Sequence, residues 1–97
     1  LKFDYPDAAI EAEIVAHEAG TTLDIAERLV GIALCSRALK NKGLDEGIST
    51  RMLIYAGMLI SASVDPRQSC DMTMTAALTD DPDMAMALRG FVEAYFD

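Results

Sequence analysis

The chain has 97 residues, of which 52% are hydrophobic, and its formal net charge is -8. This length suits one small domain with a single core, and the hydrophobic content excludes a disordered chain. The acidic balance argues against nucleic acid as a partner, and the longest uncharged stretch, residues 52–64, is too short to cross a membrane.

The first predicted helix follows a short opening segment, Leu1 to Tyr5, which has the pattern of the end of a strand. Pro6 suits a first-turn position, and Gly20 is expected to end the helix. Apolar residues recur at helical spacing between them, at Ile10, Ile14 and Val15. Because the chain opens on Leu1 and not on Met, we expect it to be a piece of a larger protein.

A second predicted helix opens at Thr21 to Asp24, which resembles a capping box with Asp in place of Glu or Gln. Cations gather at its end, where they complement the helix dipole, and Gly43 is expected to end it. These cations are Arg37, Lys40 and Lys42. The apolar stripe of this helix is predicted at Ile25, Leu29, Val30, Ala33, Leu34, Ala38 and Leu39.

Three more helices are predicted after a loop at residues 43–47. Ser49 is a good N-cap for the third, Asp65-Pro66 starts a fourth that runs to about Leu78, and Asp81-Pro82 starts the fifth. We therefore predict an all-α bundle of four or five helices. Its mostly buried residues are expected to include Ile14, Leu29, Val30, Leu34, Leu53, Leu59, Ile60, Leu88 and Phe91. The fifth helix should also turn Val92, Tyr95 and Phe96 toward the core.

Catalytic and metal-binding motifs are missing from the sequence: it has no phosphate loop, no nucleophile elbow, no HExxH and no CxxC. We interpret His17 as a surface residue at a helix end, and Cys35 and Cys70 as reduced thiols of a cytoplasmic protein. A methionine-rich set could form an adaptable binding surface, although core packing is the favoured interpretation. This set comprises Met72, Met74, Met84 and Met86.

Arg51 is the residue that needs an explanation. With Ser49 as N-cap it stands at the second helical position, where a cation costs about 0.3–1 kcal/mol. Arg67 has the same position in the fourth helix, but Asp71 follows it four residues later, whereas no acid lies near Arg51 on its own helix. Two interpretations stay open at this point. Arg51 faces a phosphate, or it pairs with Asp45, Glu46 or a distant acid.

Three segments resemble the C-terminal region of the CbbQ/NirQ/NorQ proteins, which are AAA+ ATPases of the MoxR type. They are FDYPDAAIEAEIVAHEAG at 3–20, GISTRMLIYAGMLI at 47–60 and LTDDPDMAMAL at 78–88. The similarity covers nearly the whole chain in order, and the Gly-x-Ser-Thr-Arg element is its most specific part. The resemblance implies that residues 1–5 end the last strand of the ATPase core or form a linker, and that residues 6–97 are the helical lid.

The resemblance also implies a function. Arg51 matches the sensor 2 arginine, which faces the nucleotide phosphates from the start of a lid helix, and Ser49 and Thr50 are further candidates for nucleotide contact. Thr50 stands where related MoxR proteins often carry proline. The implied cofactors are ATP and Mg in the full-length protein. No catalytic or metal-binding residue is expected in this fragment, because the residues that hydrolyse ATP belong to the core.

The partners implied by the resemblance are the protein's own AAA+ core, the neighbouring subunits of a hexameric ring, and a von Willebrand A domain protein of the CbbO/NorD type. Such pairs activate or remodel a target enzyme such as Rubisco or nitric oxide reductase. The alternative is a non-enzymatic helical adaptor that binds through the methionine-rich helices. A helix-turn-helix regulator is disfavoured by the acidity of the chain. A phosphate loop upstream of Leu1 would favour the ATPase, and its absence the adaptor.

Overall fold

The computed structural model of the chain describes residues 7–38, 48–79 and 81–96. These residues form helices and no strand, which confirms the all-α prediction. The elements are α1 (Ala8–Ala19), α2 (Leu23–Ala38), α3 (Thr50–Ser61), α4 (Pro66–Cys70), the π-helical turn η1 (Asp71–Thr75), α5 (Ala76–Leu78) and α6 (Pro82–Tyr95). The predicted strand remnant at 1–5, Pro6, Lys40, Lys42 and Gly43 lie outside the described residues.

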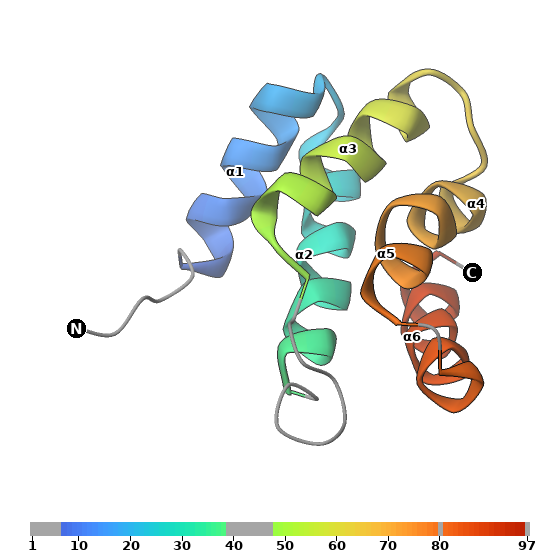
Figure 1. Ribbon diagram of the computed structural model, residues 1–97. Coiled ribbons are helices and arrows are strands. Elements are labelled where there is room, and N and C mark those ends of the chain that lie inside the picture. The colour runs from blue at the N-terminus through green and yellow to red at the C-terminus, as the bar shows by residue number, and fades with distance from the viewer. Residues whose placement is uncertain (1–6, 39–47, 80, 97) are drawn as a thin grey trace.

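The helices form two neighbouring groups around a shared core. Figure 1 shows α1, α2 and α3 on one side of the molecule and α4, α5 and α6 on the other. Helix α2 packs against α1, α3 and α6, while α3 packs against α4 and η1, so α2 and α3 join the groups. Within the described part of the chain, no helix is both long and apolar enough to pass through a lipid bilayer.

Most helix ends lie where the capping residues predicted them. Ser49 Oγ accepts a hydrogen bond from Met52 N at 3.3 Å, and Asp65 Oδ2 accepts one from Gln68 N at 3.1 Å. Asp81 Oδ1 does the same for Asp83 N at 2.9 Å. Gly20 ends α1 in the left-handed conformation, with a φ of 70°, which a glycine adopts without steric penalty. These caps confirm the predicted starts of the last three helices and the end of the first.

The caps of the first two helices are Asp7 and Thr22. Helix α1 begins at Ala8, because Asp7 is its N-cap and its Oδ2 accepts a hydrogen bond from Ala9 N at 3.3 Å. The predicted start of the second helix was wrong by one residue: α2 is capped by Thr22 and not by Thr21, since Thr22 Oγ1 accepts from Ile25 N at 3.2 Å.

The fourth predicted helix is interrupted by a π-helical turn that sequence periodicity gave no sign of. Helix α4, η1 and α5 form one continuous helical run from Pro66 to Leu78. Asp71, the first residue of the π turn, was expected to pair with Arg67 on its own helix. Instead its Oδ1 accepts a hydrogen bond from Arg89 Nε of α6 at 2.7 Å. A tertiary partner has therefore taken the place of the weak local one.

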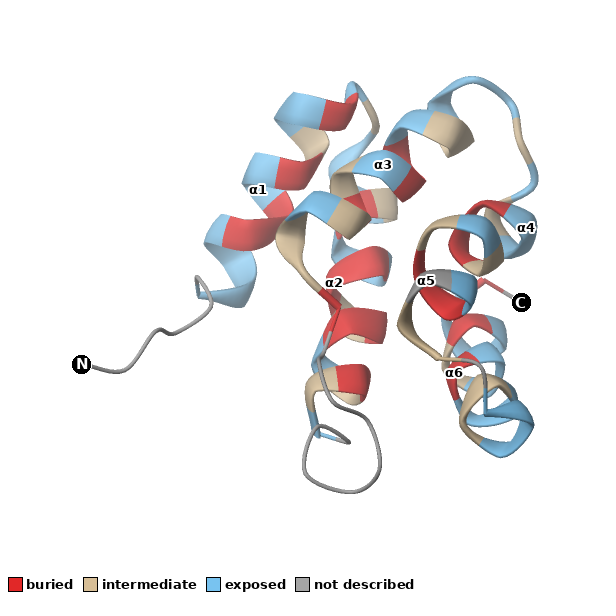
Figure 2. Cartoon of the chain, viewed as in Figure 1, coloured by how far each residue is buried: buried red, intermediate tan, exposed pale blue. Residues whose placement is uncertain are grey.

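Buried residues lie on the inward faces of the helices, both within the group of α1, α2 and α3 and between the two groups (Figure 2). The prediction of a buried residue is confirmed for Leu29, Val30, Leu53 and Leu88, which are at most 3% exposed. Leu59, Ile60 and Phe91 are half-buried. Of the further residues predicted on α6, Val92 and Phe96 are buried, whereas Tyr95 is 38% exposed.

Two predicted core residues, Ile14 and Leu34, are exposed by 38% and 50%. On α1 the buried face consists of Glu11, Ala12, Val15 and Ala19. Of the apolar residues predicted to recur along this helix, Val15 is therefore buried, whereas Ile10 and Ile14 are exposed. On α2 the buried face takes Ala33 and Ser36 instead of Leu34. On both helices the buried face contains polar or small side chains, and the spacing of large apolar residues does not predict their burial.

Helices α1 and α3 approach each other closely at Gly57. A Cβ atom added to Gly57 would lie 2.8 Å from the Cβ of Ala19, which is closer than two methyl carbons can pack. We expect Gly57→Ala to lower the free energy of unfolding by about 1–3 kcal/mol through overpacking. Urea unfolding of the 97-residue chain measures this.

Gly90 provides the matched control, because it also lies inside a helix but has no atom within 4 Å of an added Cβ. Gly90→Ala should stabilise the chain by about 0.5–1 kcal/mol through helix propensity alone. Equal stabilisation by both substitutions would contradict the close approach of α1 and α3.

Candidate functional site

The first turn of α3 carries the residues predicted to meet a phosphate. Ser49 is its N-cap, Thr50 its first residue and Arg51 its second. No acidic residue lies in this turn, and the Arg51 side chain is exposed. The structure therefore places a cation on the surface at the positive end of a helix dipole, where it receives no local compensation.

Arg51 has no acidic partner among residues 7–38, 48–79 and 81–96, whose ion pairs involve other arginines. Of the acids that the sequence offered as partners, Asp45 and Glu46 lie outside the described residues. A distant acid within the described residues is ruled out by this geometry. The guanidinium is thus available to an anion that approaches the surface.

Arg67 stands at the corresponding position of α4 but has a different environment. Its Nε donates a hydrogen bond to the carbonyl oxygen of Phe96 at 3.0 Å. The two arginines, which the sequence distinguished only by their neighbours, therefore differ in the structure. Arg67 connects α4 to the C-terminal end of α6, whereas Arg51 forms no hydrogen bond or ion pair with the residues that the structure describes.

Ser49 and Thr50 lie beside Arg51, but their hydroxyls are used inside the domain. Ser49 Oγ caps α3 through Met52 N. Thr50 Oγ1 donates a hydrogen bond to Glu11 Oε2 at 2.8 Å, and Ser49 and Thr50 are both half-buried. The hydroxyl proton of Thr50 is committed to Glu11, so Arg51 is the group of this turn that is best placed for an external ligand.

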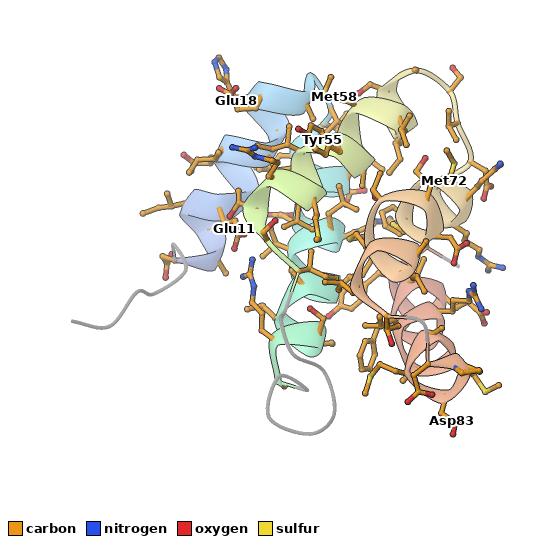
Figure 3. The ribbon with its side chains drawn as sticks, viewed as in Figure 1. Glu11, Glu18, Tyr55, Met58, Met72 and Asp83 are labelled. Carbon is orange, nitrogen blue, oxygen red and sulfur yellow. The ribbon has the colours of Figure 1, made fainter. Side chains whose placement is uncertain are left out.

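Glu11 is the residue in contact with this turn that sequence reasoning missed. It is fully buried, at 0% exposure, and Figure 3 shows it where α1 faces α3. Arg37 of α2 holds it in a two-pronged ion pair, with Nη1 to Oε1 at 2.9 Å and Nη2 to Oε2 at 2.7 Å. Its spacing of four residues before Val15 was the available signal, since Glu11 shares a helix face with a core residue.

The ionisation of Glu11 is determined by these contacts. Burial alone raises the pKa of its carboxyl group, but the hydrogen bonds from Arg37 and Thr50, together with the charge of Arg37, outweigh burial and lower it. Glu11 is therefore a carboxylate at neutral pH. Arg37 lies in the last turn of α2, as predicted, and it is also the ion-pair partner of Glu11.

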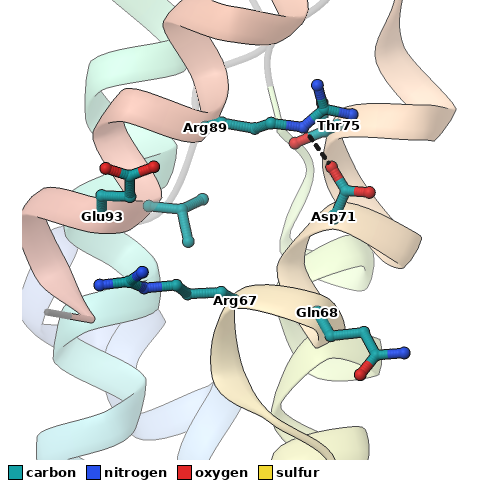
Figure 4. A pocket seen from close by; sticks show the side chains of 7 residues that line it. Arg67, Gln68, Asp71, Thr75, Arg89 and Glu93 are labelled. Carbon is teal, nitrogen blue, oxygen red and sulfur yellow. Dashed lines mark hydrogen bonds and ion pairs between the residues drawn. The ribbon is translucent and has the colours of Figure 1, made fainter.

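A pocket of about 230 Å³ lies between α4, η1 and α6, away from Arg51 (Figure 4). Its lining includes Arg67, Arg89 and Asp71, and the ion pair between Arg89 and Asp71 crosses its edge. Thr75, in the π turn, also lines the pocket, and its buried hydroxyl forms no hydrogen bond with the residues that the structure describes. Because two acids accompany its two arginines, the pocket has no net charge that would select a phosphate.

The methionines and cysteines do not form a common site. Met74 is buried and Met84 half-buried, while Met72 and Met86 are 55% and 71% exposed on different elements. Cys35 and Cys70 are free thiols. Burial, with a smaller contribution from the charge of Asp65, raises the pKa of the Cys70 thiol to about 12, so this cysteine is an unreactive core residue.

Comparison with known proteins assigns the chain to a family. The model of the CbbQ/NirQ/NorQ C-terminal region matches residues 11–95. Protein CbbQ of Hydrogenophilus thermoluteolus is 49% identical over 96 residues, which cover 99% of this chain and 36% of that protein. NirQ of Pseudomonas aeruginosa, a denitrification regulatory protein, is 40% identical over 95 residues, covering 98% of this chain and 36% of that protein.

A third relative, protein NorQ of Paracoccus denitrificans, is 38% identical over 96 residues, which cover 99% of this chain and 36% of its own length. The chain thus spans about a third of the length of the curated relatives that it matches. The family match, the identity to three differently named members and the all-α fold agree. The chain belongs to the CbbQ/NirQ/NorQ family and corresponds to its C-terminal region.

Proposed function

We propose that this chain is the C-terminal lid of a MoxR-type AAA+ ATPase and that Arg51 binds the terminal phosphate of ATP. The observation that carries the proposal is the environment of Arg51. It is an exposed guanidinium in the first turn of α3, and no described acid pairs with it. Family membership, together with the resemblance of Arg51 to the sensor 2 arginine, supports ATP as the source of the anion.

The residues of this turn fit a phosphate in charge and in geometry. A guanidinium can give a phosphate two parallel hydrogen bonds, and the positive end of the α3 dipole adds to the attraction. ATP would supply the phosphoanhydride bond to be hydrolysed and Mg would neutralise part of the phosphate charge, while Arg51 would hold the terminal phosphate. The lid would then move with the nucleotide state, because the contact is lost with the terminal phosphate.

The wider assembly is part of the same proposal. The lid would pack on its own AAA+ core within a hexameric ring in the cytoplasm, and the ring would work with a von Willebrand A domain partner of the CbbO/NorD type. The target would be an enzyme such as Rubisco or nitric oxide reductase. The support for these partners is the membership of the chain in the CbbQ/NirQ/NorQ family.

Nucleotide discrimination in the full-length protein tests the role of Arg51. Arg51→Ala should weaken ATP binding by roughly ten- to a hundredfold and leave ADP binding nearly unchanged, because only ATP carries the phosphate in question. Arg51→Lys should restore only part of the affinity, since an ammonium cannot form the two-pronged contact. Titration with labelled nucleotides provides both dissociation constants.

The matched control is Arg89→Ala, which removes another exposed arginine whose ion pair to Asp71 lies elsewhere on the domain. Its ratio of ATP to ADP affinity should equal that of the wild type. Equal weakening of ATP and ADP by Arg51→Ala would contradict a contact with the terminal phosphate.

A further inference from the structure

The three residues that precede Arg51 are each held by polar contacts. Ile48 is 1% exposed, its N–H donates to Ser36 Oγ at 3.1 Å, and its carbonyl oxygen accepts from Arg37 Nε at 3.0 Å. Ser49 caps α3, and Thr50 donates to Glu11. Contacts with α1 and α2 therefore hold the backbone at residues 48–50, immediately before Arg51.

Glu11 is the centre of these contacts. One of its carboxylate oxygens, Oε2, accepts hydrogen bonds from Arg37 at 2.7 Å and from Thr50 at 2.8 Å. The same Arg37 side chain reaches Ile48 O through its Nε. A single buried carboxylate thus connects α1, α2 and the first turn of α3, and Thr50 is the covalent neighbour of Arg51.

A buried ion pair is weak evidence for a gain in stability, because well-packed apolar residues at the same positions often give an equally stable fold. Its best-attested role is to favour one arrangement of the packed helices over alternative arrangements. The hydroxyl of Thr50 lies 2.8 Å from a carboxylate that is 0% exposed, so this contact directs the first turn of α3 inward. Arg51, one residue later, is exposed.

We propose that Glu11, acting through Arg37 and Thr50, is a positioning residue that sets the orientation of Arg51 toward its phosphate. The inference rests on the proposed function. The Glu11 carboxylate touches no ligand, because it is fully buried. It keeps the first turn of α3 in one orientation, so that the backbone of Arg51 is already in place when nucleotide binds and the turn loses little conformational entropy on binding.

The first readout is independent of nucleotide: amide hydrogen exchange of residues 48–53 in the nucleotide-free full-length protein. Thr50→Val keeps the shape of the side chain but removes the donated hydrogen bond, and Glu11→Gln removes the charge. Both should speed exchange in this segment by roughly tenfold, whereas Thr50→Ser, which retains the hydroxyl, should exchange like the wild type.

The second readout is the affinity for ATP. Thr50→Val and Glu11→Gln should each weaken ATP binding by roughly three- to tenfold. In the Arg51→Ala background neither should weaken it further, because a positioning residue has no effect once the residue that it positions is gone. Thr22→Val is the matched control, since it removes a capping hydroxyl from α2 and should change neither the exchange at 48–53 nor the ATP affinity.

The outcomes separate the two proposals. If Arg51→Ala leaves ATP affinity unchanged, the proposed function fails. If Arg51→Ala weakens ATP binding while Thr50→Val and Glu11→Gln leave either the exchange or the affinity as in the wild type, the proposed function stands and the positioning role is overturned. A loss of affinity that adds fully to that of Arg51→Ala also overturns it.

Discussion

Glu11→Ala is expected to lower the free energy of unfolding of the 97-residue chain by about 3–5 kcal/mol at pH 7, the largest loss from any single substitution considered for this domain. The reason is that Arg37, whose side chain is 9% exposed, would keep its buried charge without a partner. Thr50 would also lose its acceptor. The free energy of unfolding of a small domain is about 5–15 kcal/mol in total, so the midpoint of urea unfolding should shift to a much lower urea concentration.

Glu13→Ala is the control for this substitution, because Glu13 lies on the same helix but is exposed. Its effect should stay within about 0.5 kcal/mol. Similar small losses for both variants would show that the pair of Glu11 and Arg37 contributes little to the fold.

The stabilisation by Glu11 should depend on pH in a defined direction. Because the pKa of its carboxyl group is lowered in the folded chain from the ordinary value of 4.5, its contribution is present above that value and is lost as the pH falls through the folded pKa. Glu11→Gln cannot titrate. The stability difference between the wild type and Glu11→Gln should therefore shrink as the pH is lowered from 7 to about 3.

Arg51→Ala is expected to lower ATP hydrolysis by the full-length protein by roughly ten- to a hundredfold, while the unfolding of the 97-residue chain hardly changes. The loss of activity follows from the missing contact with the terminal phosphate. The unchanged stability follows from the structure, since Arg51 is exposed, opposes the dipole of α3 and pairs with no described acid. Steady-state hydrolysis and thermal melting provide the two values.

The comparison of the two measurements separates the alternative roles of Arg51. A structural ion pair would give the reverse pattern, with a destabilised chain and normal hydrolysis once stability is restored. Arg89→Ala, in which an exposed ion pair is lost, should leave hydrolysis as in the wild type and reduce stability by at most about 1 kcal/mol.

The helical segments and most of their ends could be predicted because their signals are local. Ser49, Asp65 and Asp81 each cap a helix through a backbone N–H two or three residues later. Such contacts depend on adjacent residues alone. The lack of an acid on the helix of Arg51 could be recognised for the same reason, because it is visible in the adjacent sequence.

The orientation of α1 could not be predicted because it depends on a tertiary contact. Apolar spacing favoured Ile10 and Ile14, yet Glu11 faces the core, because Arg37, 26 residues later, and Thr50, 39 residues later, satisfy its carboxylate. Burying a charge costs free energy unless the charge is paired. Because a hydrophobicity pattern does not show the partner, it assigns a charged residue to the surface. The contact between Glu11 and the first turn of α3 therefore could not be predicted from the hydrophobic pattern.

The central claim, that Arg51 meets the terminal phosphate, is tested most directly by one distance. In a structure of the full-length protein with a non-hydrolysable ATP analogue, an Arg51 guanidinium nitrogen should lie about 2.7–2.9 Å from an oxygen of the terminal phosphate. An Arg51 side chain that pairs with an acid of the protein and lies beyond hydrogen-bond distance of the nucleotide would contradict the account.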